Sequence, residues 1–304
     1  MENLRPAAET QEPIVRSLDW EDRRRRLSLD TAGVSHRGRR RLNQDQHLIA
    51  DLLSARRRDG AGSDHGNLQS RAEEMLLVVA DGMGGHPCGE VASLLAVRVL
   101  VKELLAGPAA VDDPLAKLDA AVRCADEALH RAGARRSDLA TMGTTLTAAW
   151  WLPPMLFFAH VGDSRLYLLR DGRLARLTRD HTLAAKLLAG GIDRDRTHDV
   201  LHVLTQALGG AQKGVDPDEG VRRLQAGDAL LLCTDGLGRG VTDAEIARAL
   251  ERADSAHTVA VALLEGALAT DDGDNITAVV ARVLPTARRG EGDERRGGSQ
   301  EVVP

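Results

Sequence analysis

The chain has 304 residues, of which 43% are hydrophobic and only 2% aromatic, and its formal net charge is −5. This length suits one large domain or two small ones, and the charge and scarce aromatic side chains argue against a nucleic-acid-binding surface. Three widely spaced cysteines, no apolar run of membrane-spanning length and no signal-peptide pattern predict a cytoplasmic protein without a disulfide framework or zinc site.

The first predicted elements are two strands that follow a charged stretch. Residues 1–26 are polar and end in four arginines, so we expect a flexible N-terminal extension. Alternating apolar positions from Leu27 predict a half-buried strand, and residues 46–51 predict a second strand that pairs with it in antiparallel fashion. Residues 54–74, rich in arginine, glycine and serine, are predicted to form a surface insertion.

The next segment carries an acidic residue at the end of an apolar strand. Residues 75–80 predict a buried strand that ends on Asp81, and three glycines in the next four positions predict a sharp turn before a helix at 87–106. Carboxylate and carbonyl oxygens at such a turn suit a hard metal cation. Taken alone, the same residues also fit a tight strand-to-helix turn with a solvated aspartate.

The remainder of the chain predicts mainly strands and helices in alternating groups. Strands are expected at 144–150, 155–161, 166–170, 173–177, 228–233 and 276–284, and helices at 114–132, 242–252 and 256–269. Asp171-Gly172 predicts a hairpin turn. Residues 181–205 combine a helical pattern with glycines and many charges, as expected of a mobile flap, and residues 286–304 predict a disordered tail.

Aspartates recur at the predicted strand ends. The positions concerned are Asp45, Asp81, Asp163, Asp235 and Asp274. Strand ends of one sheet core can converge on one edge, where buried carboxylates would repel each other. Shared divalent cations relieve this repulsion, activate water and clamp a phosphoryl group. Arg40 would offer a planar guanidinium for phosphate oxygens.

The aspartates and Arg40 occur within a set of six short motifs whose order along the chain resembles that of a known family. They are Arg40-x-x-Asn43-Gln44-Asp45, Asp81-Gly82-Met83-Gly84-Gly85-His86, Met142-Gly143-Thr144-Thr145, Gly162-Asp163-Ser164-Arg165, Thr234-Asp235-Gly236-Leu237 and Asp274-Asn275-Ile276-Thr277. The set resembles the metal-dependent, type-2C serine/threonine protein phosphatases over about residues 27–285. The resemblance implies an α+β fold, a four-layer α-β-β-α sandwich with two central antiparallel sheets and helices outside.

The resemblance also implies cofactors and the residues that hold them. It implies Mn²⁺ or Mg²⁺, two ions bound tightly and a third more weakly. Asp81 is implied to bridge two metals with the Gly82 carbonyl on the first, and Asp235 and Asp274 to bind the second. Asp163 is implied to hold the weaker third metal. The implied substrates are phosphoproteins, including a serine/threonine kinase, and the implied role is to oppose a bacterial-type serine/threonine kinase.

The remaining roles concern substrate and water. Arg40 is implied to grip the substrate phosphate, and Asp45 to orient water at the metals without binding them. Gln44 stands where many members have Glu, and Met83 stands where eukaryotic members have a histidine proposed as general acid. The proton donor to the leaving group is therefore unassigned, and His86 is a weak candidate for it.

Two other functions compete with phosphoprotein hydrolysis. A catalytically silent, phosphoprotein-binding scaffold of the same fold should lack at least one metal carboxylate, whereas every expected aspartate is present here. A two-metal phosphodiesterase would also need clustered aspartates, so the acidic residues alone do not separate it from a phosphatase. Manganese-dependent turnover of monoesters and diesters would separate all three.

Overall fold

The computed structural model describes most of residues 27–286. The described residues are 27–53, 56–59, 68–70, 74–83, 88–106, 112–192, 200, 202–211, 213–252, 254–270 and 273–286. The predicted N-terminal extension therefore lies outside the described residues, as does all but the first residue of the predicted tail.

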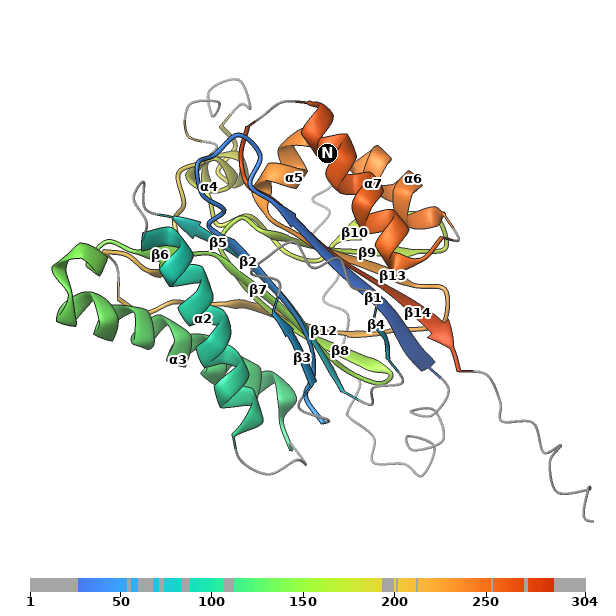
Figure 1. Cartoon of the computed structure of the whole chain (residues 1–304), viewed down its shortest axis with the longest axis horizontal. Coiled ribbons are helices and arrows are strands. Elements are labelled where there is room, and N and C mark those ends of the chain that lie inside the picture. Colours follow the sequence, from blue (N-terminus) through green and yellow to red (C-terminus); the bar gives the residue numbers. More distant parts are fainter. Residues whose placement is uncertain are drawn as a thin grey trace, which may run out of the picture.

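The described strands form two antiparallel sheets (Figure 1). The six-stranded sheet has the order β10-β9-β13-β14-β1-β4, with β1 (Leu27–His36), β4 (Leu68–Ser70), β9 (Arg165–Arg170), β10 (Arg173–Arg176), β13 (Ala229–Cys233) and β14 (Ile276–Pro285). The eight-stranded sheet has the path β11-β6-β5-β7-β8-β12, with β2 and β3 joined to it through β5. Its strands are β2 (Asp45–Asp51), β3 (Arg56–Asp59), β5 (Met75–Met83), β6 (Gly143–Thr144), β7 (Leu146–Leu152), β8 (Met155–Val161), β11 (Leu208–Gly209) and β12 (Asp218–Arg223).

Helices cover the outer face of each sheet. The long helices α2 (Cys88–Leu105) and α3 (Pro114–Arg135) pack on the eight-stranded sheet, and α5 (Asp235–Gly240), α6 (Asp243–Glu251) and α7 (Ala256–Ala269) pack on the six-stranded sheet. The remaining described helices are α4 (Leu183–Ala189) and a single 3₁₀ turn, Ser137–Leu139. This arrangement confirms the predicted four-layer sandwich. No helix in the described part of the chain combines the length and the apolar character needed to span a membrane.

The strand sequences account for the layers. In β5, the even-numbered residues from Leu76 to Ala80 pack against the helices, and the odd-numbered residues from Met75 to Val79 pack between the sheets. Because successive side chains of a strand point to opposite faces, a strand that is apolar at every position belongs in the middle of a sandwich. The same reasoning corrects the prediction for β1, which is buried on both faces between residues 29 and 34 rather than half-buried.

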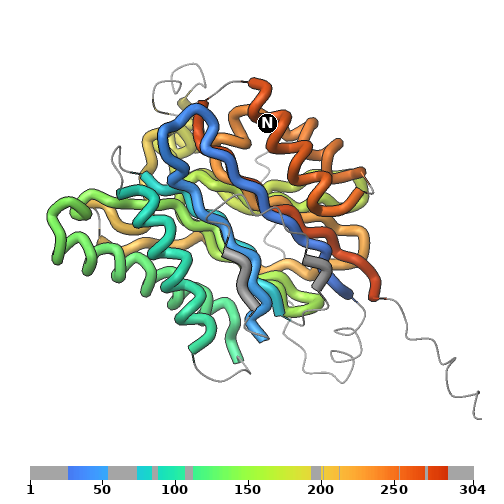
Figure 2. Tube along the Cα trace, in the orientation of Figure 1, coloured from blue at the N-terminus to red at the C-terminus, as the bar shows by residue number. Residues whose placement is uncertain are grey.

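The predicted pairing of the first two strands is wrong. β1 pairs with β14 along its whole length, from Leu27 opposite Pro285 to His36 opposite Ile276, whereas β2 pairs with β5 and β3 in the other sheet. Figure 2 shows the blue and red segments of β1 and β14 running side by side. The turn after His36 carries the chain from one sheet to the other, and alternation within a strand holds no information about such a crossing.

The segment predicted as a surface insertion also contributes to the sheets. Within it, β3 extends the eight-stranded sheet beside β2, and β4 extends the six-stranded sheet beside β1. Both are short strands at the ends of their sheets. The turn-rich composition of residues 54–74 conceals them, because an edge strand needs backbone pairing on one side only.

Candidate active site

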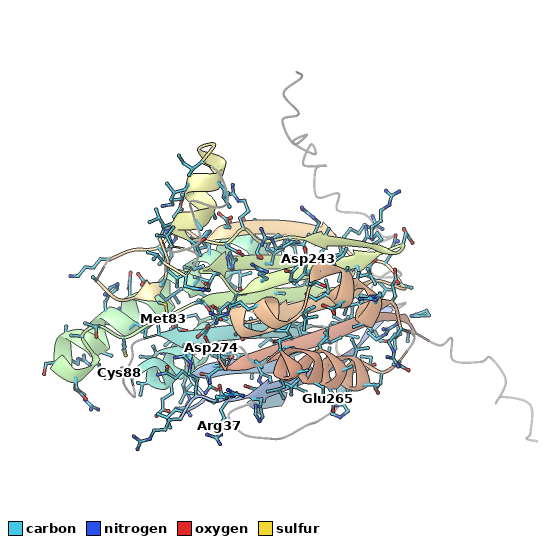
Figure 3. All side chains as sticks on the ribbon, turned by 90° about the horizontal axis from the view of Figure 1, so that it is seen from above. Arg37, Met83, Cys88, Asp243, Glu265 and Asp274 are labelled. Carbon is cyan, nitrogen blue, oxygen red and sulfur yellow. The ribbon has the colours of Figure 1, made fainter. Side chains whose placement is uncertain are left out.

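A cavity of about 360 Å³ gathers nearly all of the predicted site residues. It is lined by Arg40, Gln44, Asp81, Gly82, Met83, Thr145, Asp163, His202, Leu204, Asp235, Arg239, Asp274 and Asn275. Figure 3 labels two of these residues, Met83 and Asp274, at the same end of the molecule. Of the residues assigned a role from the sequence, only Asp45 does not line the cavity.

Asp45 lies directly behind the cavity, opposite Asp81 in the register of β2 and β5. Its Oδ2 accepts hydrogen bonds from the hydroxyls of Thr234 (2.8 Å), which directly follows β13, and Thr277 (2.7 Å), which lies in β14. Its Oδ1 has no hydrogen-bond partner among the described residues. Burial raises the pKa of Asp45 to about 7, against the opposing effect of the two hydroxyls.

Asp81 is fixed through its backbone. Its N–H donates to Oγ1 of Thr145 (2.9 Å), and its carbonyl oxygen accepts from Oγ1 of Thr144 (2.9 Å). Burial, followed by the charges of Asp45 and Asp235, holds the pKa of Asp81 well above its usual range. The two threonines therefore position the strand end, and Asp81 sits in an electrostatically crowded position.

Gly82 serves close packing rather than the predicted turn. β5 continues through Asp81 and Gly82 to Met83, so the backbone does not reverse at the glycine. A Cβ at Gly82 would stand 2.1 Å from the carbonyl oxygen of Gly89 and 2.7 Å from that of Gln44. Residues 84–87, including His86, lie outside the described residues.

Asp163 sits in a turn immediately after β8. The preceding Gly162 has φ of 112°, a conformation that residues with a side chain rarely adopt. After it, Arg165 binds both oxygens of Asp180, with Nε at 3.2 Å and Nη2 at 2.9 Å. Burial, then the charge of Asp235, raises the pKa of Asp163 to about 7. A rigid turn thus holds an acid whose charge is costly in the absence of a cation.

Two arginines bind the acids that come from the six-stranded sheet. Asp235 follows β13 as the first residue of α5, and Asp274 precedes β14. Nη2 of Arg239 donates to Oδ1 of Asp235 (2.9 Å) and also to Oδ2 of Asp274. Nη2 of Arg40 donates to the same Oδ2 of Asp274 at 2.9 Å, although 60% of the Arg40 side chain is exposed.

Asn275 organises the turn that carries Arg40. Its Oδ1 accepts from the backbone N–H of Gln44 (2.8 Å), and its Nδ2 donates to the carbonyls of Arg37 (2.9 Å) and Leu42 (3.0 Å). One amide side chain therefore fixes both ends of the turn between β1 and β2, and Arg40 projects from between these anchor points.

Arg239, His202 and Leu204 line the cavity but were not predicted from the sequence. The short helix α5 was not expected, and with it the i, i+4 spacing of Asp235 and Arg239, which is the signal that could have found the arginine. Within the predicted flap, the described helix α4 spans only Leu183–Ala189. His202 and Leu204 lie later in the same segment, and no sequence pattern indicates that they line the cavity.

The donor chemistry of the cavity fits a hard divalent cation. Asp81, Asp163, Asp235 and Asp274 supply carboxylate oxygens, which Mn²⁺ and Mg²⁺ prefer, and the raised pKa values of Asp81, Asp163 and Asp235 reflect burial and mutual repulsion that a cation would relieve. Among the described residues, no group of three or more Asp, Glu, His or Cys side chains is arranged so that it could hold a metal ion. Oxygens of Asp235 and Asp274 contact Arg239 instead.

Comparison with known protein sequences gives a consistent result. The model of the protein phosphatase 2C family matches residues 32–267. The serine/threonine protein phosphatase PstP of Mycobacterium tuberculosis is 41% identical over 239 residues, which cover 75% of this chain and 45% of that protein. The chain thus spans about half the length of this relative. The serine/threonine phosphatase stp of Listeria monocytogenes is 35% identical over 221 residues, which cover 71% of this chain and 87% of that protein.

Solved structures share the fold. The catalytic domain of PstP, solved in complex with two manganese ions, superposes with a TM-score of 0.69 at 38% identity and covers 85% of this chain and 99% of that one. Stp1 of Staphylococcus aureus gives a TM-score of 0.71 at 26% identity and covers 84% of this chain and 94% of that one. The resemblance drawn from the six motifs is therefore confirmed at the level of sequence family and of fold.

Proposed function

The chain belongs to the protein phosphatase 2C family, and on that premise we propose that it is a metal-dependent phosphatase acting on phosphoserine and phosphothreonine in proteins. The observation that carries the proposal is the convergence of four carboxylates and Arg40 on one cavity. We take residues 27–285 as the catalytic unit, and phosphoproteins, including a bacterial-type serine/threonine kinase that it opposes, as its substrates.

The cavity offers a defined set of metal ligands. We assign Asp81 and the carbonyl of Gly82 to a first metal, with Asp81 shared with a second metal that Asp235 and Asp274 complete. Asp163, held in its turn at the cavity wall, is assigned to a third and weaker position. Divalent cations there would activate a water molecule at neutral pH and neutralise charge on the phosphoryl group.

Two residues are assigned to substrate and water. Arg40 is exposed and ion-paired to Asp274, so its guanidinium can exchange that carboxylate for the oxygens of an incoming phosphate. Asp45 does not line the cavity, and its Oδ1 lacks a partner among the described residues, so we assign it a positioning role behind Asp81. Met83 has no proton to give, which leaves protonation of the leaving serine or threonine oxygen to another group.

The test is manganese-dependent turnover of three substrates: a phosphothreonine peptide, an aryl phosphate monoester and an aryl phosphate diester. We expect hydrolysis of both monoesters, complete dependence on Mn²⁺ or Mg²⁺, and loss of activity when the metal is chelated. Turnover of the diester alone would replace the proposal with a phosphodiesterase. Binding of the phosphopeptide without turnover of any substrate would replace it with a phosphoprotein-binding scaffold.

A further inference from the structure

Arg239 occupies an unusual position for a surface arginine. It lies on α5, one turn after Asp235, and only 27% of its side chain is exposed. One nitrogen, Nη2, donates to carboxylates from two separate segments, those of Asp235 and Asp274. The other, Nη1, lies 3.4 Å from Nδ1 of His202. A simple helix-stabilising pair would need only the contact within α5.

The two carboxylates that Arg239 joins are those assigned to the second metal. An aspartate oxygen that accepts a short, charge-assisted hydrogen bond has less negative charge to offer a metal cation. The guanidinium of Arg239 donates to both carboxylates, so the arginine already performs part of the neutralisation that a metal would provide.

We propose that Arg239 is a resident counter-cation, which holds Asp235 and Asp274 together in the metal-free protein and must be displaced before a divalent cation can bind both carboxylates. The proposal rests on the metal assignment given above for the proposed phosphatase. It makes metal binding at this position a competition between an ion and an arginine. Arg239 therefore sets the metal concentration that the site requires and lessens carboxylate repulsion when metal is scarce.

The experiment measures Mn²⁺ binding by calorimetry and melting temperature by scanning calorimetry on the full chain after metal removal. In Arg239→Gln, the weaker of the two main Mn²⁺ binding steps should tighten about tenfold, since one charge-assisted contact no longer has to be broken. The metal-free variant should melt at a lower temperature than the unchanged protein, because Asp235 and Asp274 each lose a charged donor, although Arg40 still pairs with Asp274. Saturating Mn²⁺ should remove this difference.

Two further variants make the result specific. Arg248→Gln removes one positive charge from an exposed position on the neighbouring helix α6, where the side chain donates to the carbonyl of Ala244, and should leave Mn²⁺ binding unchanged. Arg239→Lys keeps the charge without the planar fork and should tighten binding less than Arg239→Gln, about threefold. It also keeps the test decisive if the glutamine variant does not fold.

The outcomes separate this inference from the proposed function. Unchanged or weaker Mn²⁺ binding in both Arg239 variants would overturn the counter-cation role, whatever the phosphatase assays show. Equal tightening in Arg248→Gln would also overturn it, because the effect would then reflect net charge alone. Conversely, a chain that binds Mn²⁺ in the predicted order but hydrolyses no phosphate ester would refute the proposed function and leave the inference standing.

Discussion

The two sheets contribute acids of different character to the same cavity. Asp45, Asp81 and Asp163 come from the eight-stranded sheet or the turn that follows it, and no ion pair joins them to a basic side chain in the described part of the chain. Asp235 and Asp274 flank strands of the six-stranded sheet, and both are ion-paired to arginine.

This difference shows which half of the site needs an outside cation. Burial raises the pKa values of the eight-stranded-sheet acids, and neither the hydroxyl donors to Asp45 nor the charge of Arg239 near Asp163 offsets this rise, so protonation or a metal would relieve their charges. The acids of the other sheet carry their own counter-charges. The first metal should therefore bind mainly because of Asp81, and the second despite Arg239.

The largest expected effect is on turnover, and it should be the same for acids that come from either sheet. Asp81→Asn and Asp274→Asn should each lower kcat by about 10³ or more, because each removes a proposed metal ligand that acts as part of a unit. The check is steady-state hydrolysis of a phosphothreonine peptide at saturating Mn²⁺, with circular dichroism to confirm folding. Near-normal turnover in either variant would show that its carboxylate is not part of the proposed metal site.

Asp163→Ala should show that Asp163 has a different role from Asp81, the other cavity-lining acid of the eight-stranded sheet. We expect two tightly bound Mn²⁺ ions to remain, while turnover of a phosphothreonine peptide falls about 10²-fold, the scale of assistance to a leaving group. An aryl phosphate, whose leaving group departs without a proton, should lose less activity. Metal stoichiometry and turnover on both substrates are the measurements, and an equal loss on both substrates would refute a role for Asp163 in protonation.

Arg40→Ala tests the exposed arginine of the other half. A residue that contacts phosphate in both ground and transition states supplies largely uniform binding, so KM should rise about tenfold or more, with a smaller fall in kcat. Arg39→Ala and Arg41→Ala are matched controls on the same exposed turn. A larger effect in either control than in Arg40→Ala would show that the phosphate contact has been assigned to the wrong arginine of this turn.

In the metal-free protein, substitutions of acids from the two sheets should change the free energy of unfolding in opposite directions. Asp81→Asn removes a buried, repelled charge and should stabilise the protein by about 1 kcal/mol or more. Asp274→Asn deprives Arg40 and Arg239 of a partner and should destabilise it by up to about 1 kcal/mol, since these contacts are partly exposed. Urea unfolding after metal removal measures both changes, and a shift of the same sign in both variants would contradict the comparison.

The smallest effect is on pH dependence. The pKa values of Asp45 and Asp163 are raised from 3.8 to about 7 in the folded protein, so the folded state binds more protons than the unfolded state between these pH values. The stability of the metal-free protein should therefore fall as pH rises from about 4 to 7 and then level off. Saturating Mn²⁺ should flatten the fall, and an unchanged slope with metal bound would count against a shared site.

The sequence predicts the position of the cavity better than its internal contacts. Asp81, Asp163 and Asp235 were found because each ends or follows an apolar strand, and strand ends converge when strands pack into sheets. The pairing of β1 with β14 was not found, because the two strands lie at opposite ends of the chain and alternation does not identify a partner. The localisation expected from composition stays a prediction.

Two errors have local physical causes. Gly82 was interpreted as a turn residue, whereas its missing side chain makes room for the backbone of α2, a requirement visible only once the neighbouring helix is placed. Arg239 was missed because a helix of six residues is too short to show hydrophobic periodicity. The neighbour that explains Gly82 is supplied by tertiary structure, whereas Asp235, the first partner of Arg239, lies one helical turn away in the sequence.

The hydroxyl donors to Asp45 couple the local unfolding of one sheet to the local unfolding of the other. Thr277 lies in β14 of the six-stranded sheet and Thr234 directly follows β13 of the same sheet, while their common acceptor begins β2 in the other sheet. If β2 frayed, both hydroxyls would lose their acceptor, and if the other sheet opened, a buried carboxylate would lose both donors. Amide hydrogen exchange at β2 and at β14 should therefore report one cooperative event, so that the two walls of the cavity loosen together.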